Sequence, residues 1–278
     1  MAGQWMQYFC CKVKRMMNKT ESCAVLIILF LFTHANFIMN CVQYKNQYVQ
    51  QMFMPVKLLT LSEWSYAGYL LMLIYPVLVI LPSMSEPMED RESGELYYLG
   101  SRINRWTYYS GNLCAVFFCT FLIFTIPFLT EFIMSIICFP REAAGDPSNI
   151  DYIRMLGTEN QYFLSCVYQF SPQMYAVICT LLFGMVSGII AVSNTVFGSA
   201  IKIRHRILGF LPVYLILLMA SWMDRFLSLP FSLNYMNYRM FSASAQGMWK
   251  VCIPAVCFWF LGLIAFMKRK RKDREVDR

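Results

Sequence analysis

Six long apolar runs, spread along the whole 278-residue chain, limit how this sequence can fold more than any other feature. We place them at Ser22–Asn40, Trp64–Met84, Gly111–Phe139, Ser165–Val196, Ile207–Met223 and Trp249–Met267. A helix needs roughly 20 mostly apolar residues to cross about 30 Å of hydrocarbon. The runs are continuous rather than alternating, which favours helices over strands. The sequence therefore predicts an all-α integral membrane protein with six transmembrane helices in a single domain, residues 1–278.

Composition points the same way. Hydrophobic residues make up 58% of the chain and charged residues 14%, whereas ordinary soluble domains are about 45–50% apolar and about 25% charged. This balance argues against soluble enzymes, disordered proteins and nucleic-acid modules. The net charge of +8 does not change that conclusion, because the basic residues gather beside the apolar runs and in the tail, residues 268–278.

The distribution of lysine and arginine predicts how the chain is oriented. If both tails are inside, the inner segments hold 17 basic residues and the outer segments hold six. The inner segments are 1–21, 85–110, 197–206 and 268–278, and the outer segments are 41–63, 140–164 and 224–248. Because positive residues favour the cytoplasmic side, we expect a multi-pass protein of the cell (plasma) membrane with both termini cytoplasmic.

Several local patterns refine this layout. Aromatic and methionine residues alternate with lysines over residues 3–19, which favours an amphipathic helix on the inner surface over a disordered basic tail. Pro127 and Pro172 are possible kink points in the third and fourth runs. Residues 224–248 are too apolar for a free aqueous loop, so we expect this loop to dip back as a re-entrant or interfacial element before the last run.

Polar and small residues inside the runs are further candidates. Ionisable groups at membrane depth are costly, so Glu131 and His34 are candidates for a substrate path. Glu131 has two alternatives, a bond to a neighbouring helix or a place at the outer headgroups, and His34 has the alternative of helix packing. Gly184 and Gly188 form a GxxxG pattern suited to close helix packing, either within the chain or at a dimer seam.

No motif for catalysis or metal binding is present. The 11 cysteines include no CxxC pair and no Cys/His spacing suited to zinc. Only two histidines occur, His34 and His205, and no nucleophile–base motif accompanies them. The chain also has no G-x-x-x-x-G-K-[ST] phosphate-binding loop. We therefore predict no catalytic residues, no metal site and no ATP hydrolysis by this chain itself.

The inner segment 85–110 is the most informative part of the chain. Its front is acidic, a short apolar patch follows at residues 96–99, and Arg102 and Arg105 precede an aromatic entry into the third run. This pattern predicts a short amphipathic element that exposes charged and aromatic side chains to the cytoplasm. A docking surface would look like this, and so would a solvated loop with interfacial tyrosines.

The same segment resembles a motif of type-2 ATP-binding-cassette (ABC) transporter permeases. In that family the pattern E-x-x-G-T-L-x-x-L-L-x-x-P-x-S-R, and then G-K, lies between the second and third spans. Glu92, Gly94, Leu96 and Leu99 resemble its front half, and residues 101–105 resemble its S-P-x-S-R. Arg102 stands where proline is usual, residues 111–112 read Gly-Asn instead of G-K, and one residue is missing between Gly94 and Arg105.

The resemblance implies that roughly Glu89–Arg105 is a coupling helix gripped by a separate ATPase subunit. Its ATPase-coupling residues would be Glu89, Asp90, Glu92, Gly94, Leu96, Leu99, Arg102 and Arg105. The resemblance further implies a second permease subunit, ATP and Mg bound on the ATPase and not on this chain, and export of an apolar or amphipathic substrate. The alternative is a polytopic protein without ATPase coupling: a secondary transporter, an immunity or sensor component, or an intramembrane enzyme.

Overall fold

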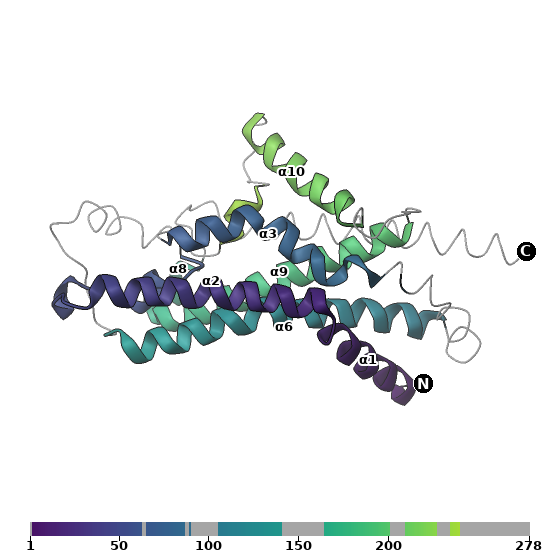
Figure 1. Cartoon of the computed structure of the whole chain (residues 1–278), viewed down its shortest axis with the longest axis horizontal. Helices are drawn as coiled ribbons and strands as arrows, with labels where there is room; N and C mark the ends of the chain where they lie inside the picture. Colours follow the sequence, from purple (N-terminus) through teal and green to yellow (C-terminus); the bar gives the residue numbers. More distant parts are fainter. Residues whose placement is uncertain are drawn as a thin grey trace, which may run out of the picture.

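The computed structural model describes residues 2–62, 65–86, 89, 105–140, 164–200, 209–226 and 234–239. All regular structure within these residues is helical. The α-helices are α1 (Ala2–Met17), α2 (Thr20–Tyr44), α3 (Tyr66–Met84), α6 (Arg105–Cys138), α8 (Ser165–Phe170), α9 (Pro172–Ala200) and α10 (Leu211–Phe226). The long helices pack side by side into an elongated bundle (Figure 1).

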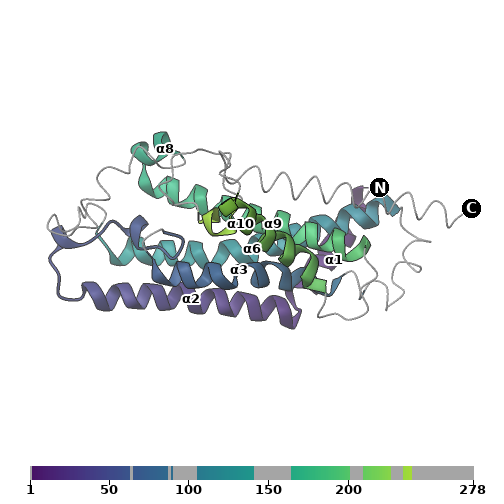
Figure 2. The ribbon, with the colours of Figure 1, turned by 90° about the horizontal axis from the view of Figure 1, so that it is seen from above.

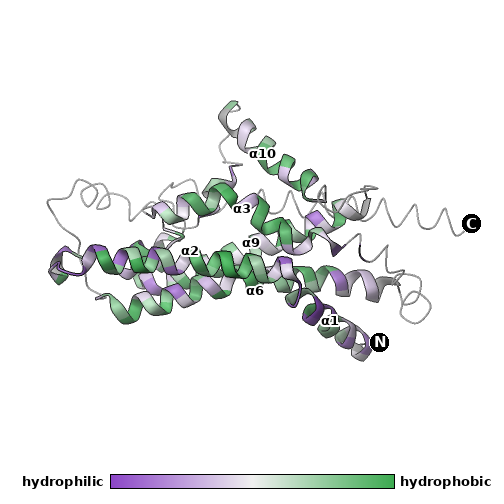
Figure 3. Cartoon of the chain, in the orientation of Figure 1, coloured by the Kyte–Doolittle hydropathy of each residue, from purple (hydrophilic) through white to green (hydrophobic). Residues whose placement is uncertain are grey.

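Four of the described helices are long and apolar enough to cross a bilayer. They cover Thr20–Tyr44, Tyr66–Met84, Thr107–Cys138 and Pro172–Gly198, and hydrophobic residues, drawn green in Figure 3, recur along these helices. The fifth predicted run corresponds to α10, whose 16 residues reach only about 24 Å at 1.5 Å per residue. The sixth predicted run, residues 249–267, lies outside the described residues. The described helices are thus those of a multi-pass membrane protein, with four candidate spans among them.

The direction of the four long helices follows from their contacts. Gly188 of α9 faces Phe117 of α6 and Gly184 faces Thr125, so α6 and α9 run in opposite directions. Asn194 near the end of α9 hydrogen-bonds Ser83 near the end of α3, so these two helices run the same way. Lys19, which links α1 to α2, hydrogen-bonds Ser85 and Glu86 at the end of α3. The end of α1, the start of α2 and the end of α3 therefore lie at one end of the bundle, which is seen from a second side in Figure 2.

Aromatic side chains fill the centre of the bundle. Tyr75 of α3 is fully buried, and its ring centroid lies 5.2 Å from that of Phe183 and 5.8 Å from that of Phe124. Its hydroxyl lies 3.0 Å from Ser187 Oγ, so the polar tip is paired as well. Buried aromatic pairs in tilted or edge-on geometry add about 0.5–1.5 kcal/mol beyond area burial. This cluster holds α3, α6 and α9 together.

The α1 helix covers most of residues 3–19, the segment predicted to form an amphipathic helix. Tyr8, Lys12 and Met16 lie four residues apart and are buried, whereas Met6 and Lys14 are exposed. The buried face packs on the first half of α6, where it covers Ala115, Val116 and Cys119. Its apolar side is therefore used for packing within the chain.

The two prolines behave differently. The backbone at Ser171 is extended, and this residue separates α8 from α9, so Pro172 begins a new helix. Proline suits this first position because its missing N–H would have had no helical partner there. By contrast, α6 continues through Pro127 to Cys138. The fourth predicted run is thus broken at Pro172, its single proline, and the third is one continuous helix.

Part of the apolar loop after α10 folds back on the bundle. The 3-10 helix η5 (Tyr235–Tyr238) places Tyr238, which is 1% exposed, 6.3 Å from the Tyr75 ring. Ser221 Oγ of α10 donates a hydrogen bond to Asn234 Oδ1 just before η5. Within residues 234–239 the loop therefore returns to the core of the bundle.

Candidate functional site

Five charged residues meet where α1 and α2 approach the end of α3. Lys12 Nζ lies 2.7 Å from Glu86 Oε2, and Lys19 Nζ pairs with Glu86 Oε1. Glu89 Oε2 lies 2.7 Å from Lys19 Nζ and 3.3 Å from Arg15 Nη2. We call Lys12, Arg15, Lys19, Glu86 and Glu89 the ion cluster.

The central pair of the ion cluster is buried. The Glu86 side chain is 0% exposed and the Lys12 side chain 2% exposed. Lys12 reaches this position because it lies on the apolar face of α1, one turn after Tyr8 and one turn before Met16. A buried charge without a partner costs several kcal/mol. The two groups therefore have to stay together for α1 to remain docked.

Glu89 occupies the outer edge of the ion cluster. Partial burial by itself would raise the pKa of its carboxyl, but the hydrogen bond and charge of Lys19, together with the charge of Arg15, outweigh burial. The pKa of Glu89 is therefore lowered from its ordinary value, and the carboxylate stays charged at neutral pH. Glu89 is also the first residue of the predicted coupling segment.

The α1 helix is tied to the far side of that segment too. Trp5 Nε1 donates a hydrogen bond to Ser110 Oγ at 3.1 Å. Tyr8 packs so closely on Gly111 that an added Cβ there would lie 2.7 Å from Tyr8 Cδ1. One helix thus contacts the chain just before residues 90–104 and just after them. The described chain on both sides of residues 90–104 is therefore in contact with α1.

The structure describes only part of the predicted coupling motif. Glu89 lies in the ion cluster, and the backbone of Arg105 begins α6. The other predicted coupling residues lie outside the described residues: Asp90, Glu92, Gly94, Leu96, Leu99 and Arg102. Their role stays a prediction.

A second buried polar network lies toward the opposite end of the bundle. Glu131 of α6 is 2% exposed. Its Oε1 accepts hydrogen bonds from Asn36 Nδ2 at 2.8 Å, from the Thr60 backbone N–H at 2.9 Å and from Thr60 Oγ1 at 2.8 Å. We call Glu131, Asn36 and Thr60 the Glu131 network. It joins α2, α6 and the loop before α3, so Glu131 bonds a neighbouring helix.

Close backbone packing completes this end of the bundle. Ser65 Oγ donates a hydrogen bond to Asn36 Oδ1 and accepts one from the Gly68 N–H. An added Cβ at Gly68 would lie 1.9 Å from the Thr60 carbonyl oxygen. Only glycine lets α3 pass this close to the loop. The network therefore acts as a polar anchor for residues 55–62, and a role of Glu131 in a substrate path remains a prediction.

His34 lies apart from the Glu131 network. It is half-buried on α2, and its Nδ1 lies 2.8 Å from the Phe30 carbonyl oxygen one turn earlier. No hydrogen bond from its Nε2 to any described residue is present. The structure therefore does not bring together the two residues predicted for a substrate path.

Gly184 and Gly188 lie where α9 crosses α6. An added Cβ at Gly184 would lie 2.2 Å from Thr125 Oγ1, and one at Gly188 would lie 2.7 Å from the Phe117 ring. Their face is thus occupied by another helix of the same chain. A dimer seam at this stripe, one of the two interpretations of the motif, would require α6 to move away.

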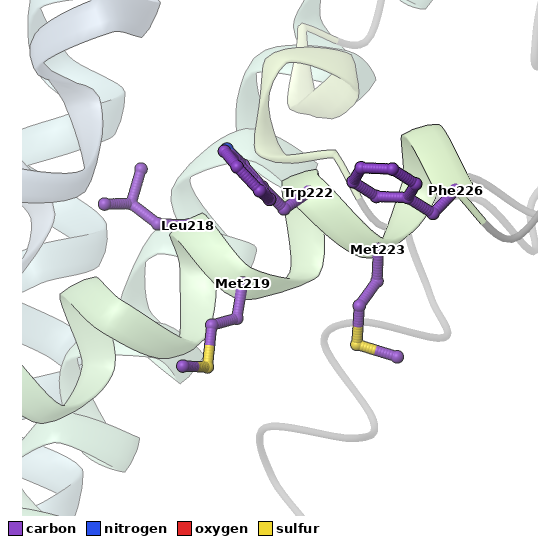
Figure 4. Close-up of a pocket in the computed structure, with 5 residues that line it drawn as sticks. All are labelled: Leu218, Met219, Trp222, Met223 and Phe226. Atoms are coloured by element: carbon purple, nitrogen blue, oxygen red, sulfur yellow. The ribbon is translucent and has the colours of Figure 1, made fainter.

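An apolar depression runs along α10. Its lining consists of Leu218, Met219, Trp222, Met223 and Phe226, and these side chains spread along one helix (Figure 4). The lining offers no charged group. Within the described ranges no group of three or more His, Cys, Asp or Glu side chains could hold a metal ion.

Sequence reasoning missed the partners in both polar networks. The buried ion pair of Lys12 could have been predicted, because a lysine in the middle of the apolar face of a helix needs an acidic partner. Thr60 carried no signal, because its bond to Glu131 spans 71 residues of sequence. Comparison with models of known protein families, with curated proteins and with solved structures finds no match.

Proposed function

We propose that this chain is the membrane-spanning permease subunit of an ABC transporter, driven by a separate ATPase subunit that docks on residues 89–105. The supporting observation is the double attachment of α1. The ion cluster fixes it to the end of α3 before that segment, and Trp5 and Tyr8 fix it to the start of α6 after the segment. A partner that pulls on the segment would move three helices as one body.

The partner subunit would carry out the ATP chemistry. ATP and Mg would bind on the ATPase, and this chain would convert closure of the ATPase dimer into a shift between inward- and outward-facing states. Two permease subunits would form the path, with both termini of each in the cytoplasm. Export of an apolar or amphipathic substrate fits the aromatic and methionine content, 23 Phe, 17 Tyr and 20 Met.

Co-purification tests this proposal. The tagged chain, extracted from its native membranes, is expected to bring down a protein whose sequence contains a phosphate-binding loop and whose ATP hydrolysis is measurable in the complex. Arg105→Ala and Gly94→Val are each expected to reduce recovery or substrate-stimulated hydrolysis by about fivefold or more, as for a contact worth over 1 kcal/mol. Lys45→Ala removes a cation at the opposite end of α2 and serves as the matched control.

Two results would count against the proposal. One is purification of the intact chain without any ATP-hydrolysing partner. The other is a partner whose binding and hydrolysis respond equally to Arg105→Ala and Lys45→Ala. Substrate movement driven by an ion gradient, with no ATPase present, would favour a secondary transporter instead.

A further inference from the structure

Two cysteines lie close together where α2 and α6 end. Cys41 is three residues before the end of α2, and Cys138 is the last residue of α6. Both helices end at the same end of the bundle, at the left in Figure 1, and both thiols are free in the structure. Two such thiols can be joined only if the helices bring them to the same height and onto facing sides.

The register of α2 and α6 brings the two cysteines to nearly the same height. The helices run in the same direction, because the end of α1 leads into α2 and the buried face of α1 packs on the first half of α6. Asn36 Nδ2 lies 2.8 Å from Glu131 Oε1. Cys41 is five residues beyond Asn36, and Cys138 is seven residues beyond Glu131. At 1.5 Å per residue their heights therefore differ by about 3 Å.

The packing around Phe139 places Cys41 on the side of α2 that faces the end of α6. The Phe139 ring centroid lies 6.2 Å from that of Phe37 and 6.1 Å from that of Tyr44. Cys41 lies one turn from each of these two α2 residues and packs in the same apolar cluster. Cys138 directly precedes Phe139, and its thiol is close enough to act electrostatically on that of Cys41. The two thiols are therefore neighbours across the helix contact.

The spacing of packed helices suits a disulfide bond at this place. Disulfide-bonded cysteines have Cα atoms about 4.4–6.8 Å apart. Packed helices have axes about 8–10 Å apart and Cα atoms about 2.3 Å from each axis, so Cα atoms on facing sides can approach to about 5 Å. Cys41 is half-buried and Cys138 is exposed, and the polar residues Gln43 and Lys45 follow Cys41. A reactant at the membrane surface can therefore reach the pair.

We propose that Cys41 and Cys138 form a disulfide bond that joins α2 to α6 at the outer end of the bundle. The bond rests on the proposed function only for the orientation of the chain, in which this end faces the outside of the cell. Disulfides form and persist on that side of a membrane, whereas thiols on the cytoplasmic side are kept reduced.

The bond forms by thiol–disulfide exchange with the oxidised disulfide of an oxidoreductase on the outer side. The Cys138 thiolate attacks that disulfide, which gives a mixed disulfide and releases one thiolate of the oxidoreductase. The Cys41 thiolate then attacks Cys138 Sγ and displaces the second. The cysteine pair loses two electrons and two protons, and the oxidoreductase leaves as a dithiol.

The bond has a consequence for how the bundle moves. A disulfide stabilises a protein mainly by restricting its unfolded chain, and more so when the loop that it closes is long. Positions 41 and 138 enclose α3 and nearly all of α6, so this loop is long. The bond also adds a covalent tie beside the Glu131 network, so α2 and α6 have to move together at this end.

Differential thiol labelling tests the bond in the unaltered full-length chain. Cells are quenched in acid, and all thiols are blocked under denaturing conditions with one maleimide before reduction and with an isotopically heavy maleimide after it. Cys41 and Cys138 are expected to carry about tenfold more of the second label than of the first, because only the reduced thiol reacts. Cys23 and Cys114, nearer the opposite ends of the same two helices, are the internal controls and are expected to carry the first label.

Digestion without reduction is expected to yield one linked peptide that contains both Cys41 and Cys138. Predominant first label on Cys138 would overturn the proposal. A link from Cys138 to any other cysteine would do the same.

Single substitutions provide a second measurement. Cys41→Ser leaves Cys138 as a free thiol, so a membrane-impermeant maleimide added to intact cells is expected to label Cys138 about tenfold more than in the unaltered protein. Cys166→Ser is the matched control, because Cys166 of α8 is also exposed, and it is expected to leave Cys138 unlabelled. Equal labelling of Cys138 in the unaltered protein and in Cys41→Ser refutes the bond, as does labelling that rises with Cys166→Ser. Neither measurement requires an ATPase, so this failure is distinguishable from failure of the proposed function.

Discussion

At Glu131, one carboxylate oxygen accepts hydrogen bonds from two segments that lie far apart in the sequence. Glu131→Leu would leave the Asn36 amide and the Thr60 N–H and hydroxyl buried without an acceptor. Each unsatisfied group costs about 1–3 kcal/mol, so this substitution is expected to destabilise the protein by about 3 kcal/mol. The measurement is the apparent melting temperature in detergent micelles.

Glu131→Gln is the matched variant, because its amide oxygen can still accept the three hydrogen bonds. It is expected to lower the melting temperature by less than half as much as Glu131→Leu. If the two variants were equally stable, or if both matched the unaltered protein, the Glu131 network would not be the anchor of residues 55–62.

Gly68 gives a second test at the scale of one residue. Gly68→Ala places a Cβ against the Thr60 carbonyl oxygen, and backbone on both sides leaves little room to adjust. It is expected to lower the melting temperature clearly and to increase protease cleavage within residues 45–62. Gly3→Ala is the control, because no atom lies within 4 Å of a Cβ added there. A stable Gly68→Ala protein with an intact loop would contradict the packing described.

At the scale of the helix, the docking of α1 depends on the ion cluster. Lys12→Met removes one of the two cations that pair with Glu86 and leaves a buried carboxylate undercompensated. Breaking buried pairs costs about 3–5 kcal/mol, and retention of Lys19 reduces this to about 2 kcal/mol. Faster hydrogen exchange across α1 is the expected result.

Lys14→Met makes the same chemical change on the exposed face of α1, and its hydrogen exchange is expected to match the unaltered protein. If Lys12→Met and Lys14→Met gave the same exchange rates, the ion cluster would not hold α1 in place.

The same docking has a defined pH dependence. Because the pKa of Glu89 is lowered in the docked state, its contribution is fully present above the ordinary value of 4.5 and is lost as the pH falls through the lowered value. Protection of α1, corrected for intrinsic exchange rates, is therefore expected to be constant from pH 7 to 5 and to fall below about pH 4.5. Glu89→Gln should remove part of that acid-induced loss. A loss of protection that begins near pH 6 would contradict this assignment.

The sequence predicted the elements better than their contacts. Apolar length marked α2, α3, α6 and α9, because this signal is local. Pro127 and Pro172 were both predicted as possible kink points, yet only Pro172 lies at a helix break. The pairs Lys12–Glu86 and Thr60–Glu131 join segments more than 70 residues apart. They depend on how the helices are arranged, and no spacing rule in one sequence reports that.

For the molecule as a whole, the two polar networks lie toward opposite ends of one aromatic core. The ion cluster holds α1 against the ends of α3 and α6, and the Glu131 network holds the loop before α3 against α2 and α6. Tyr75 and its neighbours join α3, α6 and α9 between them. A body of this kind can transmit a displacement from one end to the other as a rigid shift of helices.

Site-specific cross-linking tests whether a separate ATPase subunit docks on residues 89–105. A photoreactive side chain placed at each of these positions in the intact chain, in native membranes, is expected to form a covalent product with one ATP-hydrolysing subunit. The yield should change between the nucleotide-free and ATP-bound states. No product with an ATPase at any position, or labelling of these positions by a membrane-impermeant reagent from outside intact cells, would contradict the account.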